Sequence, residues 1–143
     1  MNYQTNIKAQ ELLSSVHLRR TRPRTSILCV LLGAVKPLSR EKIAVKLGGG
    51  APDKVTIYRT LETFVDSGLV HKAYLRKRAW HFELAHNCTE KQCHPHFTCT
   101  KCGATYCLTD VSIPLASTVN KGFTITRQRV QLEGLCPKCN AGT

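Results

Sequence analysis

The sequence predicts an α+β fold with a basic, mainly helical N-terminal half and a cysteine-rich C-terminal half. Residues 1–80 contain 15 Lys and Arg against 5 Asp and Glu, a net charge of 15 − 5 = +10, whereas residues 81–143 contain 6 against 4, a net charge of +2. Seven of the eight cysteines lie after residue 80. Each half of a 143-residue chain buries only a modest core, and small cores are often stabilised by a metal ion or by disulfides.

The N-terminal half contains a series of helical signals. Apolar residues recur at roughly helical spacing over 7–17, and Pro23 is suited to open an apolar helix that includes residues 27–32. Ser39 is a suitable N-cap for a short helix that stops at the glycines 48–50. Asp53 can cap a longer helix, which runs to about Ser67 and ends at Gly68, a typical residue after a helix.

This last predicted helix is amphipathic. Its buried stripe is expected to consist of Ile57, Leu61, Phe64 and Val65. The other faces carry Lys54, Thr56, Tyr58, Arg59 and Thr63. Cations, hydroxyls and a phenol suit contacts with phosphates and base edges in a DNA major groove, so we interpret this helix as a recognition helix. The alternative is an ordinary solvated helix face.

Two strand-like runs follow, at 69–75 and 79–84, and Arg76-Lys77-Arg78 lies between them. A hairpin with a basic tip, directly after a recognition helix, is typical of the wing of a winged helix-turn-helix domain. There the tip contacts phosphates and adds affinity without reading sequence.

The C-terminal half contains two C-x2-C pairs, Cys99-Cys102 and Cys136-Cys139. Structural zinc takes four tetrahedral thiolate or imidazole ligands, and two such pairs supply them. The 33 intervening residues leave room for a strand, a helix and another strand. The alternative is two free dithiols or two disulfides. No apolar run is long enough to span a membrane and residues 1–10 lack a secretory signal, so we expect a cytoplasmic protein with reduced cysteines.

A second group of potential ligands lies just upstream of the first pair. It comprises His81, Glu83, His86, Cys88, Cys93, His94 and His96. The two imidazoles of His94-Pro95-His96 fall on the same side of an extended segment, and His71 can approach the same point. We predict a second metal here, although any single histidine is more often a surface or core residue. Cys29 is interpreted as a buried hydrophobe. Cys93 and Cys107 are left open as further ligands or bystanders.

Several motifs together resemble the ferric uptake regulator (Fur) family over nearly the whole chain. They are Arg22-Pro23-Arg24, Val55-Thr56-Ile57-Tyr58-Arg59-Thr60-Leu61, Gly68-Leu69-Val70, Phe82-Glu83-Leu84, His94-Pro95-His96-Phe97-Thr98-Cys99-Thr100-Lys101-Cys102-Gly103, and Gly134-Leu135-Cys136-Pro137-Lys138-Cys139. The resemblance implies a cytoplasmic homodimer that binds palindromic operator DNA and uses metal as corepressor. It implies a winged-helix DNA-binding domain at 1–84, a hinge at 85–92, and an α/β dimerisation and metal-binding domain at 93–143.

The resemblance also assigns roles to single residues. Tyr58 and Arg59 match DNA-contacting positions of the family, and Arg24 matches a basic position near the DNA backbone or minor groove. With the helix and hairpin residues, the expected DNA-binding set is Arg24, Lys54, Thr56, Tyr58, Arg59, Arg76, Lys77 and Arg78.

The metal is predicted from the branch of the family that the ligands resemble. The zinc-uptake branch has a sensing site whose positions fall on His71, Cys88, His94 and His96. A thiolate in this set favours zinc over iron or manganese, and Cys107 stands where many members have an acidic ligand. A third site of the family falls on Cys93, Pro95, Pro114 and Gln128, so we expect it to be absent. We therefore expect a zinc-responsive repressor of metal-uptake genes, with one structural and one regulatory zinc per chain.

Other interpretations remain at this stage. The chain is alternatively an iron-, manganese- or peroxide-responsive member of the same family. His81-Phe82-Glu83 imitates the H-x-E motif of zinc deaminases, but the proline of the later motif lies inside the cysteine pair, and both pairs leave no open position for water. A zinc-ribbon adaptor without DNA binding leaves the basic Arg76-Lys77-Arg78 tip unexplained. We expect no enzyme, no small-molecule substrate and no membrane association.

Overall fold

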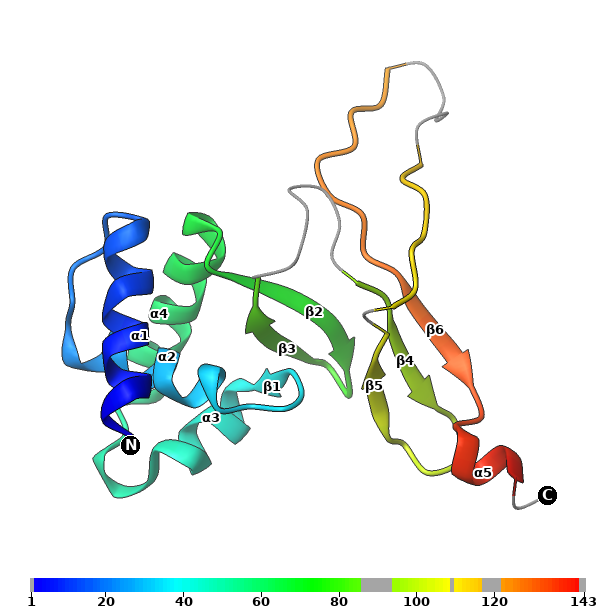
Figure 1. Cartoon of the computed structure of the whole chain (residues 1–143), viewed down its shortest axis with the longest axis horizontal. Helices are drawn as coiled ribbons and strands as arrows, with labels where there is room; N and C mark the ends of the chain where they lie inside the picture. Colours follow the sequence, from blue (N-terminus) through cyan, green and yellow to red (C-terminus); the bar gives the residue numbers. More distant parts are fainter. Residues whose placement is uncertain (1, 86–93, 109, 117–121, 142–143) are drawn as a thin grey trace. The chain divides into compact units, whose positions relative to one another are not determined.

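The computed structural model describes residues 2–85, 94–108, 110–116 and 122–141, which belong to two compact units (Figure 1). The first unit spans Met1–His86 and the second Asn87–Thr143. None of the described helices is long and apolar enough to cross a membrane. Each unit is described by itself below.

The first unit begins with four helices, α1 (Tyr3–Ser15), α2 (Arg22–Leu32), α3 (Arg40–Leu47) and α4 (Lys54–Ser67), with a short 3-10 turn at Gly48–Gly50. The predicted caps of α3 and α4 are confirmed, whereas α1 begins and ends earlier than the helical spacing over 7–17 indicated. The Ser39 hydroxyl accepts a hydrogen bond from Lys42 N at 3.2 Å, and Asp53 Oδ1 accepts one from Thr56 N at 2.7 Å. Gly68 ends α4 in the left-handed conformation, with φ of 82°.

The helices bury one hydrophobic core together with the strands that follow. Its fully buried large side chains are Leu13, Ile27, Leu28, Ile43, Ile57, Leu61, Phe64 and Val70. Three residues of the predicted α4 stripe are therefore buried. The fourth, Val65, is only half-buried, while Thr60 is 8% exposed. Thr60 lies three and four residues from Ile57 and Phe64, so the buried stripe turns slightly further towards it than the apolar pattern indicated.

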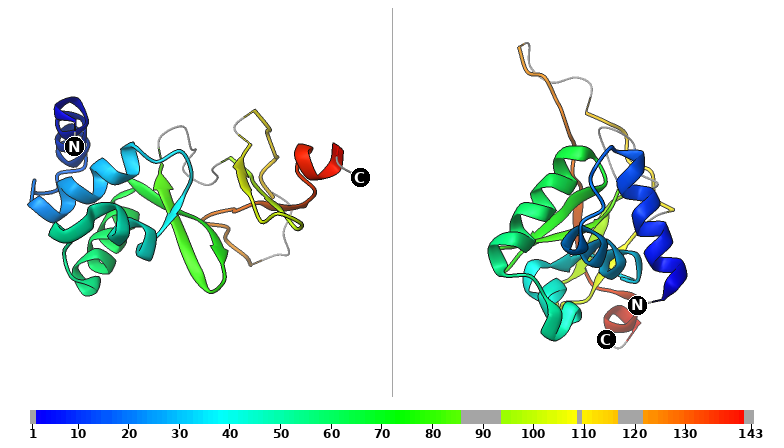
Figure 2. Two further views of the ribbon diagram at one scale, coloured as in Figure 1. Left: turned by 90° about the horizontal axis from the view of Figure 1, so that it is seen from below. Right: turned by 90° about the vertical axis from the view of Figure 1, so that its left-hand side faces the viewer.

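Strands β1 (Leu38–Ser39), β2 (Val70–Arg76) and β3 (Ala79–Leu84) form an antiparallel sheet in the order β1-β3-β2. Arg76 pairs with Ala79, so Lys77 and Arg78 form a two-residue turn, with φ of 49° and 64°. Positive φ at both central residues is typical of a type I′ hairpin turn. The β2–β3 hairpin extends away from the helices (Figures 1 and 2). The predicted hairpin with a basic tip is present.

The second unit contains β4 (His96–Cys99), β5 (Thr105–Cys107), β6 (Gln131–Gly134) and a short helix α5 (Pro137–Ala141). The sheet order is β5-β4-β6, with β4 antiparallel to β5 and parallel to β6. The length of the sequence between β5 and β6 left room for a helix. The described residues of that stretch, 108, 110–116 and 122–130, contain no helix. Pro114 and the β-branched Val111, Ile113, Thr124 and Ile125 favour extended backbone there.

The side chain of Gln128 joins residues 110–116 to residues 122–130, and we call these two segments the arm. Gln128 Oε1 accepts a hydrogen bond from Ala116 N at 2.8 Å, and Gln128 Nε2 donates one to Pro114 O at 3.1 Å. Among the described residues of this unit, only three apolar side chains are buried, those of Pro95, Cys99 and Cys136. The second unit therefore depends on its cysteines rather than on an apolar core of its own.

Candidate functional site

The β4–β6 pairing brings the two C-x2-C pairs together. Cys99 ends β4 and lies opposite Gly134 of the parallel strand β6, two residues before Cys136. Thr100 N donates to Gly134 O at 2.8 Å and fixes this register. A Cβ at Gly134 would lie 3.4 Å from the Phe97 ring, which is an ordinary van der Waals contact, so β6 passes close beside this ring.

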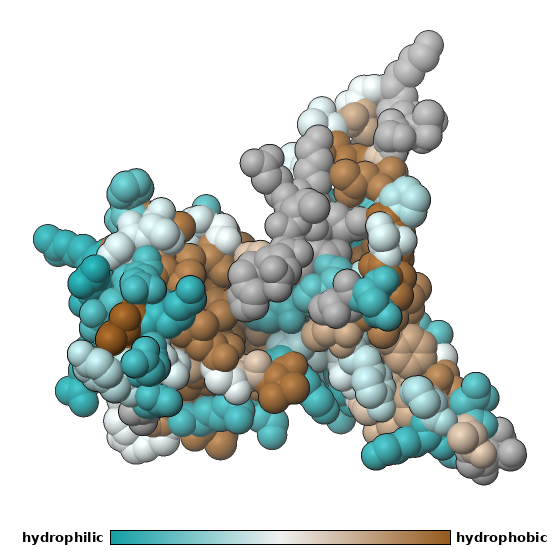
Figure 3. Space-filling view, in the orientation of Figure 1, coloured by the Kyte–Doolittle hydropathy of each residue, from teal (hydrophilic) through white to brown (hydrophobic). Residues whose placement is uncertain are grey.

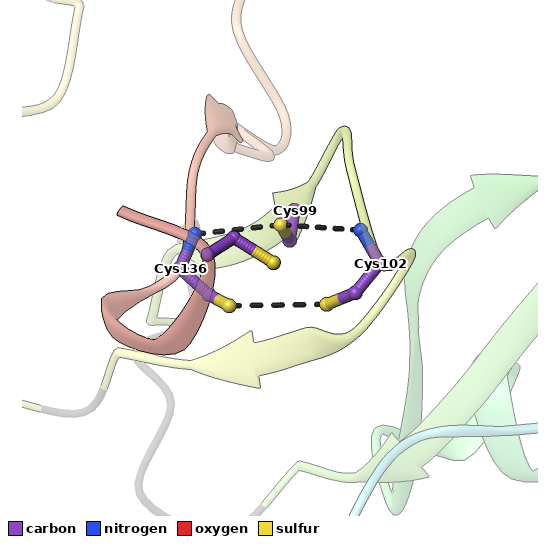
Figure 4. A group of neighbouring side chains, drawn as sticks. Cys99, Cys102 and Cys136 are labelled. Carbon is purple, nitrogen blue, oxygen red and sulfur yellow. Dashed lines mark hydrogen bonds between the residues drawn. The ribbon is translucent and has the colours of Figure 1, made fainter. Parts of the chain in front are cut away.

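The four thiols form a group of tetrahedral dimensions. All distances between sulfurs in this group are within 4.8 Å; its members are Cys99, Cys102, Cys136 and Cys139. Figure 4 shows the sulfurs of Cys99, Cys102 and Cys136 directed towards one another. The Cys102 and Cys136 sulfurs are 3.8 Å apart. A tetrahedral ion with metal–sulfur bonds of about 2.3 Å separates its ligands by about 3.8 Å, whereas a disulfide needs about 2 Å. The group therefore fits a metal ion, and the predicted four-cysteine cluster is confirmed.

Backbone amides and burial act in opposite directions on these thiols. Cys99 is 1% exposed, and its sulfur accepts hydrogen bonds from Cys102 N at 3.5 Å and Cys136 N at 3.4 Å. These bonds, that from Cys102 first, lower the pKa of the Cys99 thiol to about 6. Burial first, and then contact with the three neighbouring sulfurs, raises the pKa of Cys139 to about 12. A bound cation is what allows all four sulfurs to be thiolates together.

A second group of ligand atoms lies at the other end of the β4–β5 pair. Strand register places His96 opposite Cys107, and His94 precedes β4 by two residues. Each of the three offers an atom, and these atoms lie within 4.8 Å of one another. The two imidazole rings are 4.7 Å apart between centroids. His96 is 2% exposed. Cys107, which the sequence left open, is thus the thiol beside the H-x-H motif.

The first unit contains a separate histidine–carboxylate pair. His71 of β2 lies opposite Glu83 of β3, and His71 Nε2 and Glu83 Oε1 are 2.7 Å apart. His71 is 4% exposed. A carboxylate hydrogen-bonded to an imidazole fixes the orientation of the ring, which suits a metal ligand. Cys88 and Cys93, also predicted near this chemistry, and His86 lie outside the described residues.

His81 belongs to neither group. It stacks on Tyr74, with ring centroids 4.7 Å apart, and its Nδ1 lies 3.1 Å from the Ala79 carbonyl oxygen. Burial lowers the pKa of His81. Side chains two residues apart on a strand point to the same face, yet His81 and Glu83 have different partners. The two residues of the H-x-E motif, His81 and Glu83, therefore take part in two separate local interactions.

The predicted recognition face is exposed on α4. Lys54, Tyr58 and Arg59 are exposed, and Tyr58 retains 47% of its accessible surface. Thr56 is half-buried, and its backbone amide is bound by Asp53. One residue that the sequence analysis missed joins this face: the Arg40 guanidinium lies 5.2 Å from the centre of the Tyr58 ring. A cation over an aromatic ring cannot be inferred from periodicity, because the two residues lie on different helices.

The other predicted DNA-binding residues lie at the hairpin tip and at the start of α2. Lys77 and Arg78 are exposed in the turn, and Arg76 is half-buried at the end of β2. Arg24, in the first turn of α2, donates from Nη1 to the Arg19 carbonyl at 3.2 Å. The described residues thus present cations at three separate points of the first unit.

Comparisons with known proteins agree with the motifs. A family model described as the ferric uptake regulator family matches residues 15–133. Among curated proteins, none matches this sequence.

Several solved structures share the fold. A structure of the Vibrio cholerae ferric uptake regulator is 23% identical, with 89% of this chain and 98% of that chain covered and a TM-score of 0.62. A zinc uptake regulator complexed with zinc and DNA is 19% identical, with 97% of this chain and 95% of that chain covered and a TM-score of 0.67. The ferric uptake regulator from Pseudomonas aeruginosa with manganese is 24% identical, with 90% and 98% covered and a TM-score of 0.61. The predicted fold class is confirmed.

Proposed function

The chain belongs to the ferric uptake regulator family, and from this premise we propose that it is a zinc-responsive repressor of metal-uptake genes. Family members are metal-responsive transcription regulators and not enzymes, which excludes the deaminase interpretation. In our proposal a zinc-loaded homodimer binds palindromic operator DNA in the cytoplasm. Residues 1–84 bind the DNA, 85–92 form a hinge, and 93–143 dimerise and bind metal.

We assign the structural zinc to Cys99, Cys102, Cys136 and Cys139. The 3.8 Å distance between the Cys102 and Cys136 sulfurs supports this assignment, as does the softness of four thiolates. When bound, zinc supplies a rigid link between the end of β4 and the start of α5. Few other contacts can replace it, because Pro95, Cys99 and Cys136 are the only buried apolar side chains among the described residues of the unit.

The observation that carries the zinc-sensing proposal is the group formed by His94, His96 and Cys107, whose ligand atoms lie within 4.8 Å of one another. A set of two imidazoles and one thiolate is softer than the oxygen and nitrogen sets that suit iron or manganese. The resemblance adds His71 and Cys88 to this set. We propose that His71, Cys88, His94 and His96 hold the regulatory zinc, with Cys107 as the competing thiolate.

The proposed mechanism depends on where these residues lie in the sequence. His71 belongs to the wing, Cys88 to the hinge, and His94 to the dimerisation half. When side chains from all three regions bind the same ion, that ion restricts the movement of the hinge. This restriction selects dimers whose two recognition helices are spaced to match half-sites about one helical turn apart, or a multiple of it. Zinc thus shifts the population towards a DNA-binding arrangement that the protein already samples.

Exposed apolar side chains support the homodimer. The arm and its neighbouring strands expose Tyr106, Val111, Leu115, Phe123, Leu132 and Leu135, by 37–70% of their accessible surface. Figure 3 shows hydrophobic surface along the arm. Large exposed apolar surface in a unit with so few buried hydrophobic residues is typical of an association face. We propose that a second copy of the chain covers it.

A second candidate remains within the same family. Glu83 Oε1 lies 2.7 Å from His71 Nε2, and a carboxylate ligand favours a harder ion such as iron or manganese. This candidate differs from the first in its sensing metal and not in its fold or in its binding of DNA.

The test is a selection of binding sites from a pool of random-sequence duplexes. It is run in parallel with zinc, manganese, anaerobic ferrous iron and no added metal. We expect one palindromic sequence to be enriched with zinc and not without it. Enrichment with iron or manganese alone would instead support the second candidate, and enrichment without metal would contradict metal sensing. Cys88→Ser and Cys107→Ser variants identify which thiolate the response requires.

A further inference from the structure

We propose that Arg40 binds a phosphate of the DNA backbone and that the ring of Tyr58 positions it for this contact. The inference rests on the proposed DNA-binding function and adds a residue to the predicted interface. The argument depends on how Arg40 is fixed, on what lies beneath its guanidinium, and on the charges around it.

The backbone at Arg40 is held on both sides. Strand β1 immediately precedes it, and Leu38 and Ser39 pair with Phe82 and His81 of β3. The Ser39 hydroxyl caps α3 by accepting the hydrogen bond from Lys42 N. Arg40 is thus the first residue of a capped helix that packs against α4 (Figure 1). In helix-turn-helix domains the helix before the recognition helix crosses the DNA backbone, which is the position of α3 here.

The side chain of Arg40 is positioned as well. Its guanidinium carbon lies 5.2 Å from the centre of the Tyr58 ring, within the range of a cation–π interaction. Both residues are exposed, and Arg40 has no carboxylate partner in the salt bridges of the described residues. An exposed arginine ordinarily loses rotamer freedom when it binds a ligand. Stacking on Tyr58 reduces that loss, because the guanidinium is already restricted.

A hollow of about 90 Å³ lies beside Arg40 between α3 and α4. Its lining residues are Arg40, Glu41, Ala44, Lys54 and Ile57. Arg40 and Lys54 contribute two positive charges and Glu41 one negative charge, a net charge of 2 − 1 = +1. The net positive charge of this lining favours an anionic group such as a phosphate of the DNA backbone.

The salt dependence of DNA binding tests this contact directly. Each phosphate contact contributes about 0.9 to the slope of log K against log salt concentration. A dimer of Arg40→Gln lacks two such contacts. We expect its slope to be shallower by about 1.8, and its affinity to be about 60-fold weaker at about 0.1 M salt. The probe is a labelled random-sequence duplex, titrated in excess zinc with fluorescence anisotropy as the readout. Backbone contacts persist on that probe without a known operator.

The matched control is Lys46→Gln, which removes one exposed cation from the last turn of the same helix, outside the hollow. Its slope should remain that of the wild type. An unchanged slope for Arg40→Gln, or the same change in both variants, would overturn the inference while leaving DNA binding intact. A wild-type chain that binds no duplex would refute the proposed function too. Far-UV circular dichroism confirms that each variant is folded.

Positioning by Tyr58 has its own test. Tyr58→Phe keeps a ring beneath Arg40, whereas Tyr58→Leu removes it. We expect the leucine variant to bind the random duplex about two- to fivefold more weakly than the phenylalanine variant. In the Arg40→Gln background this difference should disappear. A difference that persists in that background would show that the ring acts independently of Arg40.

Discussion

Replacing the turn of the β2–β3 hairpin should stabilise the protein and weaken its binding to DNA. Lys77 and Arg78 have φ of 49° and 64°, values that L-residues other than glycine, asparagine and aspartate adopt rarely. Left-handed backbone costs about 1–2 kcal/mol per ordinary residue, and glycine removes that cost while adding about 0.5–1 kcal/mol of entropy loss. The double substitution Lys77→Asn/Arg78→Gly, the preferred pair for a type I′ turn, should therefore stabilise the first unit by about 1–2 kcal/mol.

The same substitution removes two exposed cations per chain. If both contact phosphates in a dimer, the slope of log K against log salt becomes shallower by up to about 3.6. Opposite effects on stability and binding would identify the strain as a cost of placing cations at the tip.

Urea unfolding measures the stability part of this prediction. Trp80 is the only tryptophan, it lies in β3, and it packs against the core of the first unit. Its fluorescence therefore reports the unfolding of this unit. Lys77→Gln/Arg78→Gln is the matched control, because it removes the same charges and keeps ordinary residues in the left-handed region. We expect both variants to lose DNA affinity and only the Asn/Gly variant to gain stability. Equal stability of the two variants would refute the reasoning from φ.

Three further predictions concern the core, a histidine of the hairpin and the metal ligands. Phe64→Ala removes a fully buried ring and should destabilise the first unit by about 3–5 kcal/mol, seen as a lower urea midpoint of Trp80 fluorescence; a shift below about 1 kcal/mol would contradict the assigned core. Burial lowers the pKa of His81 from its usual 6.5, so the unfolded chain binds more protons and stability falls as the pH drops below about 6.5. His81→Phe should reduce this pH dependence, and an unchanged dependence would assign it to another group. Cys99→Ser should abolish zinc that resists a chelator, whereas Cys107→Ser should retain it, as elemental analysis would show.

The helix ends were predictable because they depend on local interactions. Ser39 and Asp53 each bond an amide three residues ahead, and Gly68 needs only its own backbone freedom. The two strand-like runs with basic residues between them likewise predicted the hairpin. The four-cysteine cluster was predictable because each C-x2-C pair is a local signal, although the β4–β6 pairing is what joins the two pairs.

The remaining features depend on contacts between distant residues. Cys107 lies beside His96 because of the register between β4 and β5, which the sequence does not specify. Arg40 lies over Tyr58 because two helices pack together. The described residues between β5 and β6 contain no helix, although the sequence left room for one, because available length does not determine that a helix forms. Cys88 lies outside the described residues, so its role stays a prediction.

The most direct test of the account is the number of zinc ions per chain, measured by elemental analysis before and after a moderate chelator. The protein is purified under reducing conditions and equilibrated with excess zinc. We predict about two zinc ions per chain, falling to one after chelation, because the buried four-cysteine cluster retains its ion and the regulatory site exchanges its own. A constant single zinc would contradict the zinc-sensing claim and would favour iron or manganese as the regulatory metal.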